Sequence, residues 1–277
     1  MKKWLKIVVW GLLLSGVVFL LILSKRAQTE TIVSKPQIII HVTGENAFLT
    51  KNELYTRLKR KGFIFDGQQR EKLNISAIEK YIQSMSEVKT VKVYSSIGKD
   101  WKIEVLVRKP IARIFNTFGE TFYLDEDGII MKSSNLHTAR VVVVSGNIKD
   151  RINSKSVKEI INNPTLKSIQ KLDQVYRISI YVCNDPLMQS LISQIHLKSN
   201  GDFVLIPLVG GQKIIFGSAN SDEEVKEKFE KLKLFYKEAI PFEGWNKYEE
   251  ISLKYKKQIV CKTVDGYIEE EKENKHE

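Results

Sequence analysis

Residues 75–85 read ISAIEKYIQSM, and residues 91–108 follow with VKVYSSIGKDWKIEVLVR. Four apolar residues of the first segment recur at a helical spacing, which predicts a single apolar helix face: Ile75, Ile78, Ile82 and Met85. In the second segment, apolar and polar residues alternate on both sides of a turn at 95–100, which is typical of a β-hairpin with one buried face. The first half of the chain therefore combines a helix with a hairpin.

Upstream of this stretch, the sequence adds one strand and one helix. The β-branched run QIIIHVT at 37–43 predicts a strand. Thr50 followed by Glu53 forms a capping-box pair that can start a helix, and Gly62 can end that helix. The order strand, helix, helix, strand, strand predicts two helices on one side of a three-stranded sheet.

Pro110 marks a domain boundary, because proline cannot donate to a strand ladder and restrains the residue before it. Beyond it the sequence predicts short strands separated by turns, at 111–118, 121–124, 128–131, 139–145, 175–183, 192–198, 203–209 and 213–216. One last strand is expected at 249–262. Such a succession predicts a mostly antiparallel sheet.

Helices flank the strands of this second half. Two short helices are expected at 157–161 and 166–172, separated by Asn163 and Pro164. A longer helix begins at Ser221, whose capping partner is Glu224, and extends to about residue 238. The predicted fold class is α+β.

Residues 7–23 contain no charged side chain and are rich in Ile, Val and Leu. About twenty apolar residues cross the hydrocarbon core of a bilayer, and the neighbouring Trp4, Leu5 and Ser24 bring the segment to that length. We therefore predict a transmembrane helix at 7–24, preceded by a cytoplasmic tail at 1–6 and followed by a linker at 25–35.

Basic residues flank the apolar segment on both sides, so the orientation signal is mixed. Because no second apolar run returns the chain, we expect a single-pass protein with its N-terminus in the cytoplasm and its large C-terminal part outside. A cleaved signal peptide is the competing interpretation. It is disfavoured because the apolar run is long and no small-x-small site follows it.

The formal net charge of +11 is unevenly distributed along the 277 residues. The first 35 residues carry +5, whereas residues 265–277 carry −4 and are expected to form a disordered acidic tail. Elsewhere lysines are scattered among acidic residues rather than gathered with aromatic ones, which argues against nucleic-acid binding.

The sequence lacks the usual signatures of catalysis. There is no GxSxG, HxxxH, CxxC or Walker motif, and the four histidines are isolated: His41, His137, His196 and His276. The acidic cluster at 125–128 does not fit a calcium loop and is better explained as a hairpin turn. Cys183 and Cys261 are expected to be separate thiols unless the fold brings them together. We therefore expect no enzyme activity, no cofactor and no metal.

Several motifs resemble the FtsQ/DivIB family of bacterial cell-division proteins. They are the apolar segment, LVRKPIAR at 106–113, FYLDEDG at 122–128, IIFGS at 214–218 and ISLKY at 251–255. The last resembles the family's Asp-Leu-Arg-Tyr strand. The resemblance implies a POTRA domain at 36–109 and an FtsQ-type β-domain at 110–264. It also implies a non-catalytic scaffold in the bacterial cytoplasmic membrane at the division septum.

In the family, the partners are the coiled-coil pair FtsB (DivIC) and FtsL, so the resemblance implies that such proteins add a strand to the last strand of the β-domain. The implied contact residues are Lys254, Tyr255, Lys257, Ile259, Val260 and Lys262. Tyr255 would be an aromatic anchor, and Lys254 or Lys257 would meet acidic groups. Alternatively, Tyr255 packs internally and the lysines only keep an exposed edge soluble.

The chain departs from the family pattern at three places. Arg108 stands where the family often has a glutamate, Ser252 replaces the aspartate of the closing strand, and lysines 256 and 257 follow Tyr255 in place of a glycine. Two other functions stay open: a POTRA-type binding scaffold in envelope transport or assembly, and an anchored enzyme that acts on the cell wall. The enzyme would need a convergent catalytic cleft, for which the sequence gives no sign.

Overall fold

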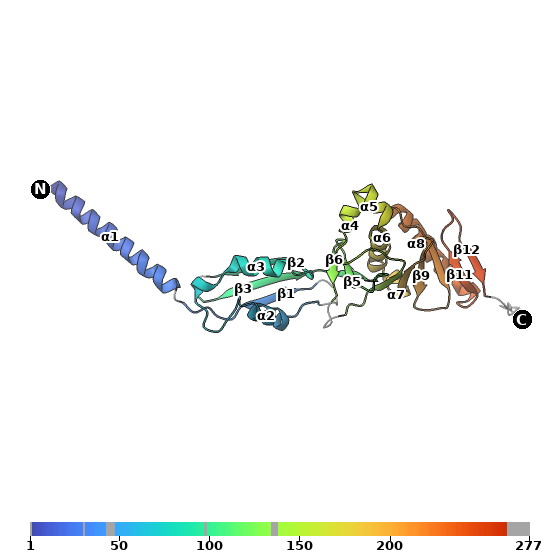
Figure 1. Ribbon diagram of the computed structural model, residues 1–277, viewed down its shortest axis with the longest axis horizontal. Coiled ribbons are helices and arrows are strands. Elements are labelled where there is room, and N and C mark those ends of the chain that lie inside the picture. Colours follow the sequence, from blue (N-terminus) through green and yellow to red (C-terminus); the bar gives the residue numbers. More distant parts are fainter. Residues whose placement is uncertain (1, 30, 43–47, 97–98, 134–137, 265–277) are drawn as a thin grey trace, which may run out of the picture. The chain divides into compact units, whose positions relative to one another are not determined.

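The structure is a computed structural model that describes residues 2–29, 31–42, 48–96, 99–133 and 138–264 (Figure 1). The chain forms two compact units, residues 1–108 and 109–277. The disordered tail expected at 265–277 lies outside the described residues.

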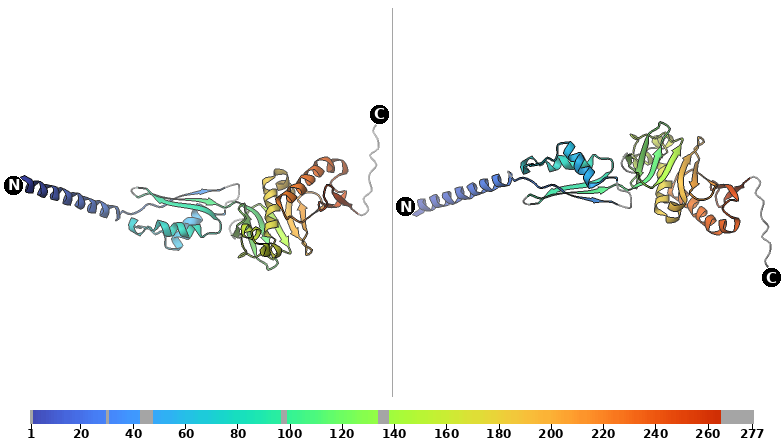
Figure 2. Two further views of the ribbon diagram at one scale, coloured as in Figure 1. Left: turned by 90° about the horizontal axis from the view of Figure 1, so that it is seen from above. Right: turned by 90° about the horizontal axis from the view of Figure 1, so that it is seen from below.

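Unit 1 has the predicted order of elements after its first helix. These elements are α1 (Lys2–Thr29), β1 (Gln37–His41), α2 (Lys51–Arg60), the short 3-10 helix η1 (Arg70–Lys72), α3 (Ile75–Gln83), β2 (Val88–Ser95) and β3 (Trp101–Val107). The sheet order is β1-β3-β2, with β1 parallel and β2 antiparallel to β3. Both views of Figure 2 place α2 and α3 on the same side of this sheet. The predicted β-α-α-β-β arrangement is therefore confirmed.

The apolar face predicted for α3 is buried against this sheet. Ile78 and Ile82 are fully buried, as are Ile103 and Val105 of β3. The predicted cap at Thr50 forms, because its hydroxyl accepts from the N–H of Glu53. Helix α3 is capped by Asn74, whose side chain accepts from the N–H of Ala77.

The segment predicted to cross the membrane lies within α1 (Lys2–Thr29). A search of the described helices found none that is both long and apolar enough to span a membrane.

Unit 2 is one nine-stranded mixed sheet with helices. Its elements are β4 (Pro110–Phe115), β5 (Thr121–Asp125), β6 (Ile130–Lys132), β7 (Val142–Gly146), α4 (Val157–Ile161), α5 (Pro164–Ile169), α6 (Leu172–Asn184), α7 (Pro186–Leu191), β8 (Ile192–Leu197), β9 (Phe203–Pro207), β10 (Lys213–Gly217), α8 (Asp222–Glu238), α9 (Ile240–Glu243), β11 (Tyr248–Ser252) and β12 (Val260–Thr263). The strand order is β12-β11-β10-β9-β8-β7-β4-β5-β6. Among these pairings only β11–β10, β8–β7 and β7–β4 are parallel, so the predicted mostly antiparallel sheet is confirmed.

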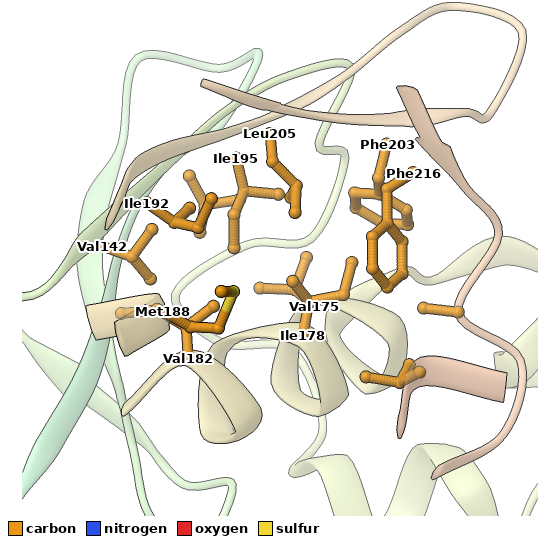
Figure 3. Close-up of a cluster of buried hydrophobic side chains, with 14 of the residues drawn as sticks. Val142, Val175, Ile178, Val182, Met188, Ile192, Ile195, Phe203, Leu205 and Phe216 are labelled. Carbon is orange, nitrogen blue, oxygen red and sulfur yellow. The ribbon is translucent and has the colours of Figure 1, made fainter. Parts of the chain in front are cut away.

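The core of unit 2 lies between one face of the sheet and the helices. Figure 3 shows side chains of α6 and α7 meeting side chains of the strands: Val175, Ile178, Val182 and Met188 on one side, and Val142, Ile192, Ile195, Phe203, Leu205 and Phe216 on the other. The long helix α8 adds Phe229 and Leu232, which are fully buried. Alternate residues of the same strands point to the opposite face of the sheet.

Two of the predicted elements are wrong. Residues 175–183 were expected to form a strand because of their β-branched content, but they belong to helix α6. Its buried residues Leu172, Val175, Ile178 and Val182 follow a helical spacing, and this burial outweighs the local preference of Val and Ile for strands.

The expected last strand at 249–262 is in fact a hairpin of two strands, β11 and β12. The chain reverses in a turn where Lys257 has a positive φ of 61°. Leu253, just after β11, is fully buried, and its N–H donates to the carbonyl of Ile215. Residues beyond it therefore leave the core and return as an outer strand.

Candidate partner-binding surface

The β11–β12 hairpin forms one end of the nine-stranded sheet. Strand β12 pairs with β11 through Ser252 opposite Val260 and Ile251 opposite Cys261, and it is the outermost strand on this side among the described residues. An outermost strand presents main-chain groups to which another strand can be added.

The backbone groups available on β12 follow from its pairing. The N–H of Val264 donates to the carbonyl of Lys247 at 3.0 Å, so residue 264 faces β11. Because backbone groups alternate along an antiparallel strand, those of Thr263 and Cys261 point away from β11. Thr263 is exposed, whereas Cys261 is partly covered and packs against the core with its side chain. These two residues supply the outer donors of the strand.

Of the six residues predicted to bind a partner, all except Ile259 are exposed, and Tyr255 and Val260 are the exposed ones without a charge. The Tyr255 side chain is 51% exposed and Val260 is 44% exposed. The carbonyl of Tyr255 accepts from the Lys231 ammonium group at 2.8 Å, which ties the turn to helix α8. The backbone of Tyr255 is therefore tied to α8 while the residue stays exposed.

Lys254 is engaged within the protein. Its ammonium group lies 2.7 Å from a carboxylate oxygen of Asp202, and this hydrogen bond raises the pKa of Lys254. The aliphatic part of the Lys254 side chain packs over Gly217, where an added Cβ would lie 2.9 Å from Cγ of Lys254. Glycine at this position therefore leaves room for the lysine stem on the sheet face.

The other predicted residues are divided between the surface and the core. Lys262 pairs with Glu249 at 2.7 Å, and this hydrogen bond lowers the pKa of Glu249. Ile259 is partly buried and packs against the hydrophobic core. Lys257 is exposed in the turn between β11 and β12. The hairpin thus brings together the six predicted residues, but Lys254, Ile259 and Lys262 all have contacts within the protein.

Sequence reasoning missed the residues that position this hairpin. Asp202 lies just before β9 and Lys231 lies on α8, so neither is near the hairpin in the sequence. Gly217 lies in the family motif IIFGS, which was the available signal, but its contact with Lys254 depends on the pairing of β10 with β11.

A groove of about 420 Å³ lies between α6 and α8. The Tyr181 hydroxyl donates to Glu230 at 2.7 Å, and burial together with this bond raises the pKa of Tyr181 to about 12. Lys233 lies 3.0 Å from Asp185 and 3.4 Å from Glu230. Since most charged groups of the groove pair within the protein, we assign it no ligand.

The acidic cluster at 125–128 forms the β5–β6 turn, as predicted. The Asp125 carboxylate accepts from the N–H groups of Asp127 and Ile129 at 3.0 and 2.6 Å. In the described part of the chain, no group of three acidic, histidine or cysteine side chains could hold a metal ion. Cys183 and Cys261 are separate thiols, and burial raises the pKa of Cys261.

Comparison with known families matches both units of the chain. Residues 109–262 match the family model "FtsQ/DivIB, C-terminal related", and residues 32–106 match the "POTRA-like domain" model. No curated protein matched the sequence. The first match covers more than half of the 277 residues, in the unit that carries the β11–β12 hairpin. The chain therefore belongs to the FtsQ/DivIB family.

Proposed function

We propose that this protein is a non-catalytic scaffold of the bacterial division complex that binds partner proteins by accepting a strand at β12. Membership of the FtsQ/DivIB family suggests a division-associated scaffold. The single observation that supports the mechanism is the outermost position of β12, with Thr263 and Cys261 directed away from β11.

The proposed partners are the division proteins of the FtsB/DivIC and FtsL type. A strand from such a partner would bond to the outer groups of β12, and the exposed ring of Tyr255 would pack against it. Lys257 would meet acidic partner groups at the rim, where charges mainly set orientation and association rate, and Lys262 would do so only after leaving Glu249. Lys254 would first have to leave Asp202, so we give it a smaller role than Tyr255.

The proposal includes a membrane anchor at 7–24, an extracytoplasmic POTRA domain at 36–109 and a β-domain at 110–264, at the septum. Support for the anchor is the uncharged run at 7–23, in which the large apolar side chains from Ile7 to Ile22 are exposed on α1. Because the search of the described helices found no span, the anchor needs its own test. Insertion of the full chain into vesicles, with protection of α1 from protease, would support it.

The strand-addition mechanism is tested by two substitutions at one position. Thr263→Pro removes an outward N–H donor, whereas Thr263→Ala keeps the donor and changes only the side chain. Loss of a bond worth about 1 kcal/mol, with the added clash of the proline ring, should weaken binding of the partner pair about tenfold or more. Thr263→Ala should change affinity by less than about threefold.

Calorimetry or a pull-down with the purified partner domains measures both variants. Tyr255→Ala serves as a test of the side-chain anchor in the same assay, and we expect it to weaken binding too. If Thr263→Pro and Tyr255→Ala both bind as tightly as the unaltered chain, the assignment of this surface is wrong. Even distribution of the protein around the envelope, with normal septation after its depletion, would instead favour the envelope-transport alternative.

A further inference from the structure

The segment that follows α1 is tied by its backbone to one end of unit 1. The N–H of Arg70 donates to the carbonyl of Thr31, and the N–H of Val33 donates to that of Gln68, both at 2.9 Å. The N–H of Ser34 donates to the carbonyl of Lys99 at 2.9 Å. Helix η1 and the residues just before β3 are therefore bonded directly to residues 31–34, which follow α1 closely in the sequence.

Side chains strengthen the same attachment. The indole N–H of Trp101, which is almost fully buried, donates to the carbonyl of Ser34 at 2.9 Å. The Ser34 hydroxyl donates to the Asp100 carboxylate at 2.9 Å. These bonds attach residues 31–34, which lie within the linker expected at 25–35, to the folded unit.

This end of unit 1 exposes both apolar and basic side chains. Ile32 is 54% exposed and Phe65 is 44% exposed. Phe65 belongs to this end because its N–H donates to the side chain of Gln68, the residue bonded to Val33. We call the exposed residues here the α1-proximal surface, and they are Ile32, Lys35, Phe65, Lys72 and Lys99.

The charge of this surface is mainly positive. Lys35, Lys72 and Lys99 are exposed, and among the described residues none of the three has a recorded ion pair. The nearby acids are Glu71, Asp66 and Asp100, of which Asp66 pairs with Lys59. The three lysines therefore outnumber Glu71 and Asp100 by one charge. Lysines surrounding a few exposed apolar groups are typical of a surface that lies on anionic lipid headgroups.

We propose that the α1-proximal surface docks on the headgroups of an anionic bilayer, with Ile32 and Phe65 in the interfacial layer. This inference rests on the proposed insertion of α1, because insertion would bring residues 31–34 to the bilayer surface. Each lysine is worth about 1 kcal/mol near an anionic membrane, and Glu71 and Asp100 offset two of the three. The net charge of +1 corresponds to a factor of about five in the docking equilibrium. Docking would hold the POTRA domain in one orientation above the membrane.

The test uses the full chain in vesicles, with Cys183→Ser and Cys261→Ser as background and one fluorescent label at a time. Phe65→Cys places the label on the α1-proximal surface. Ser84→Cys is the matched control, since Ser84 is exposed and lies at the other end of unit 1, on the order of 20 Å away along the eight residues of β2. Leu14→Cys reports on insertion of α1.

Each label is measured with a lipid-bound quencher and a water-soluble one, in vesicles with and without phosphatidylglycerol. We expect the label at residue 14 to be quenched from the lipid in both vesicles, and the label at 65 only in the anionic ones. The label at 84 should stay accessible to the aqueous quencher throughout. The triple substitution Lys35→Glu, Lys72→Glu, Lys99→Glu should abolish lipid quenching at 65 and leave that at 14 unchanged.

The outcomes separate this inference from the proposed function. If residue 14 is quenched from the lipid but the label at 65 behaves like that at 84, docking is overturned and the anchor stands. If residue 14 is not quenched, both the anchor and the docking are overturned. Equal lipid quenching at 65 in neutral and anionic vesicles would overturn the role of the lysines and hence the proposal.

Discussion

Gly146, at the end of β7, allows a quantitative test of how tightly the centre of the unit 2 sheet is built. Its φ is +99°, and an added Cβ would lie 2.2 Å from the carbonyl oxygen of Leu197 and 2.9 Å from the N of the same residue. Both are backbone atoms of the neighbouring strand β8 and cannot move away as a flexible side chain would. Gly201 has a similar φ of +89° but nothing within 4 Å of the added Cβ.

The two glycines therefore separate conformational strain from steric clash. An L-residue held at positive φ costs about 1 kcal/mol, so Gly201→Ala should lower the free energy of unfolding of unit 2 by about that amount. Gly146→Ala carries the same strain. In addition it must push β7 and β8 apart, weakening the bond from the N–H of Asn147 to the carbonyl of Leu197. We expect a total loss of about 3 kcal/mol or more, within the range for overpacking of a core.

The assay is a urea titration read by hydrogen exchange and mass spectrometry on peptides of unit 2, which separates its transition from that of unit 1. Gly201→Ala is the control for strain alone. Equal losses for the two variants would refute the reasoning, because they would mean that the β7–β8 contact yields easily to an extra methyl group.

Two further predictions concern buried charges of unit 2. Arg177 and Asp173 pair at 2.9 Å, and their side chains are only 7% and 0% exposed. Arg177→Met would leave the buried Asp173 carboxylate without its cation and should lower the free energy of unfolding by about 3–5 kcal/mol. The double substitution Arg177→Met, Asp173→Leu should recover most of this loss in the same urea titration. If Arg177→Met lowers the free energy of unfolding by less than the double substitution does, this reasoning is wrong. Burial raises the pKa of Asp150 above its ordinary 3.8 despite a backbone bond from Lys171. The native state therefore binds this proton more tightly than the unfolded state, and stability should fall as pH rises from about 4 through the raised pKa. Asp150→Asn should remove this contribution to the change of unfolding free energy with pH, measured between about pH 4 and 7. An unchanged dependence on pH would show that Asp150 is not responsible.

Local patterns in the sequence predicted unit 1 well. The caps at Thr50 and Asn74, the apolar stripe of α3 and the alternation in β3 all depend on neighbours within four residues. Their physical causes, helix capping and burial of one face, act over short distances. The predictions agreed with one another, and the structure follows them.

Prediction failed where tertiary contacts decide the structure. In α6 the β-branched residues favoured a strand, but packing of Ile178 and Val182 against the sheet requires a helix. Within the predicted final strand, the turn around Lys257 carried no glycine or proline as a signal. Both elements owe their form to partners far along the chain.

The candidate binding surface, too, could be predicted only in part from the sequence. The family motif at 251–255 falls on β11 and the start of the turn rather than on the outermost strand β12, and Tyr255 is exposed. The state of Lys254 could not be predicted, because its partner Asp202 lies 52 residues earlier and reaches it only across β10. Register between distant strands is thus the information that the sequence alone lacked.

The most direct test of strand addition is amide hydrogen exchange at single residues of β12, measured by NMR with and without the partner domains. The account predicts that the outward N–H groups of Thr263 and Cys261 become protected on binding, while the inward group of Val264 changes little. Binding of the partner with unchanged exchange at Thr263 and Cys261 would contradict it.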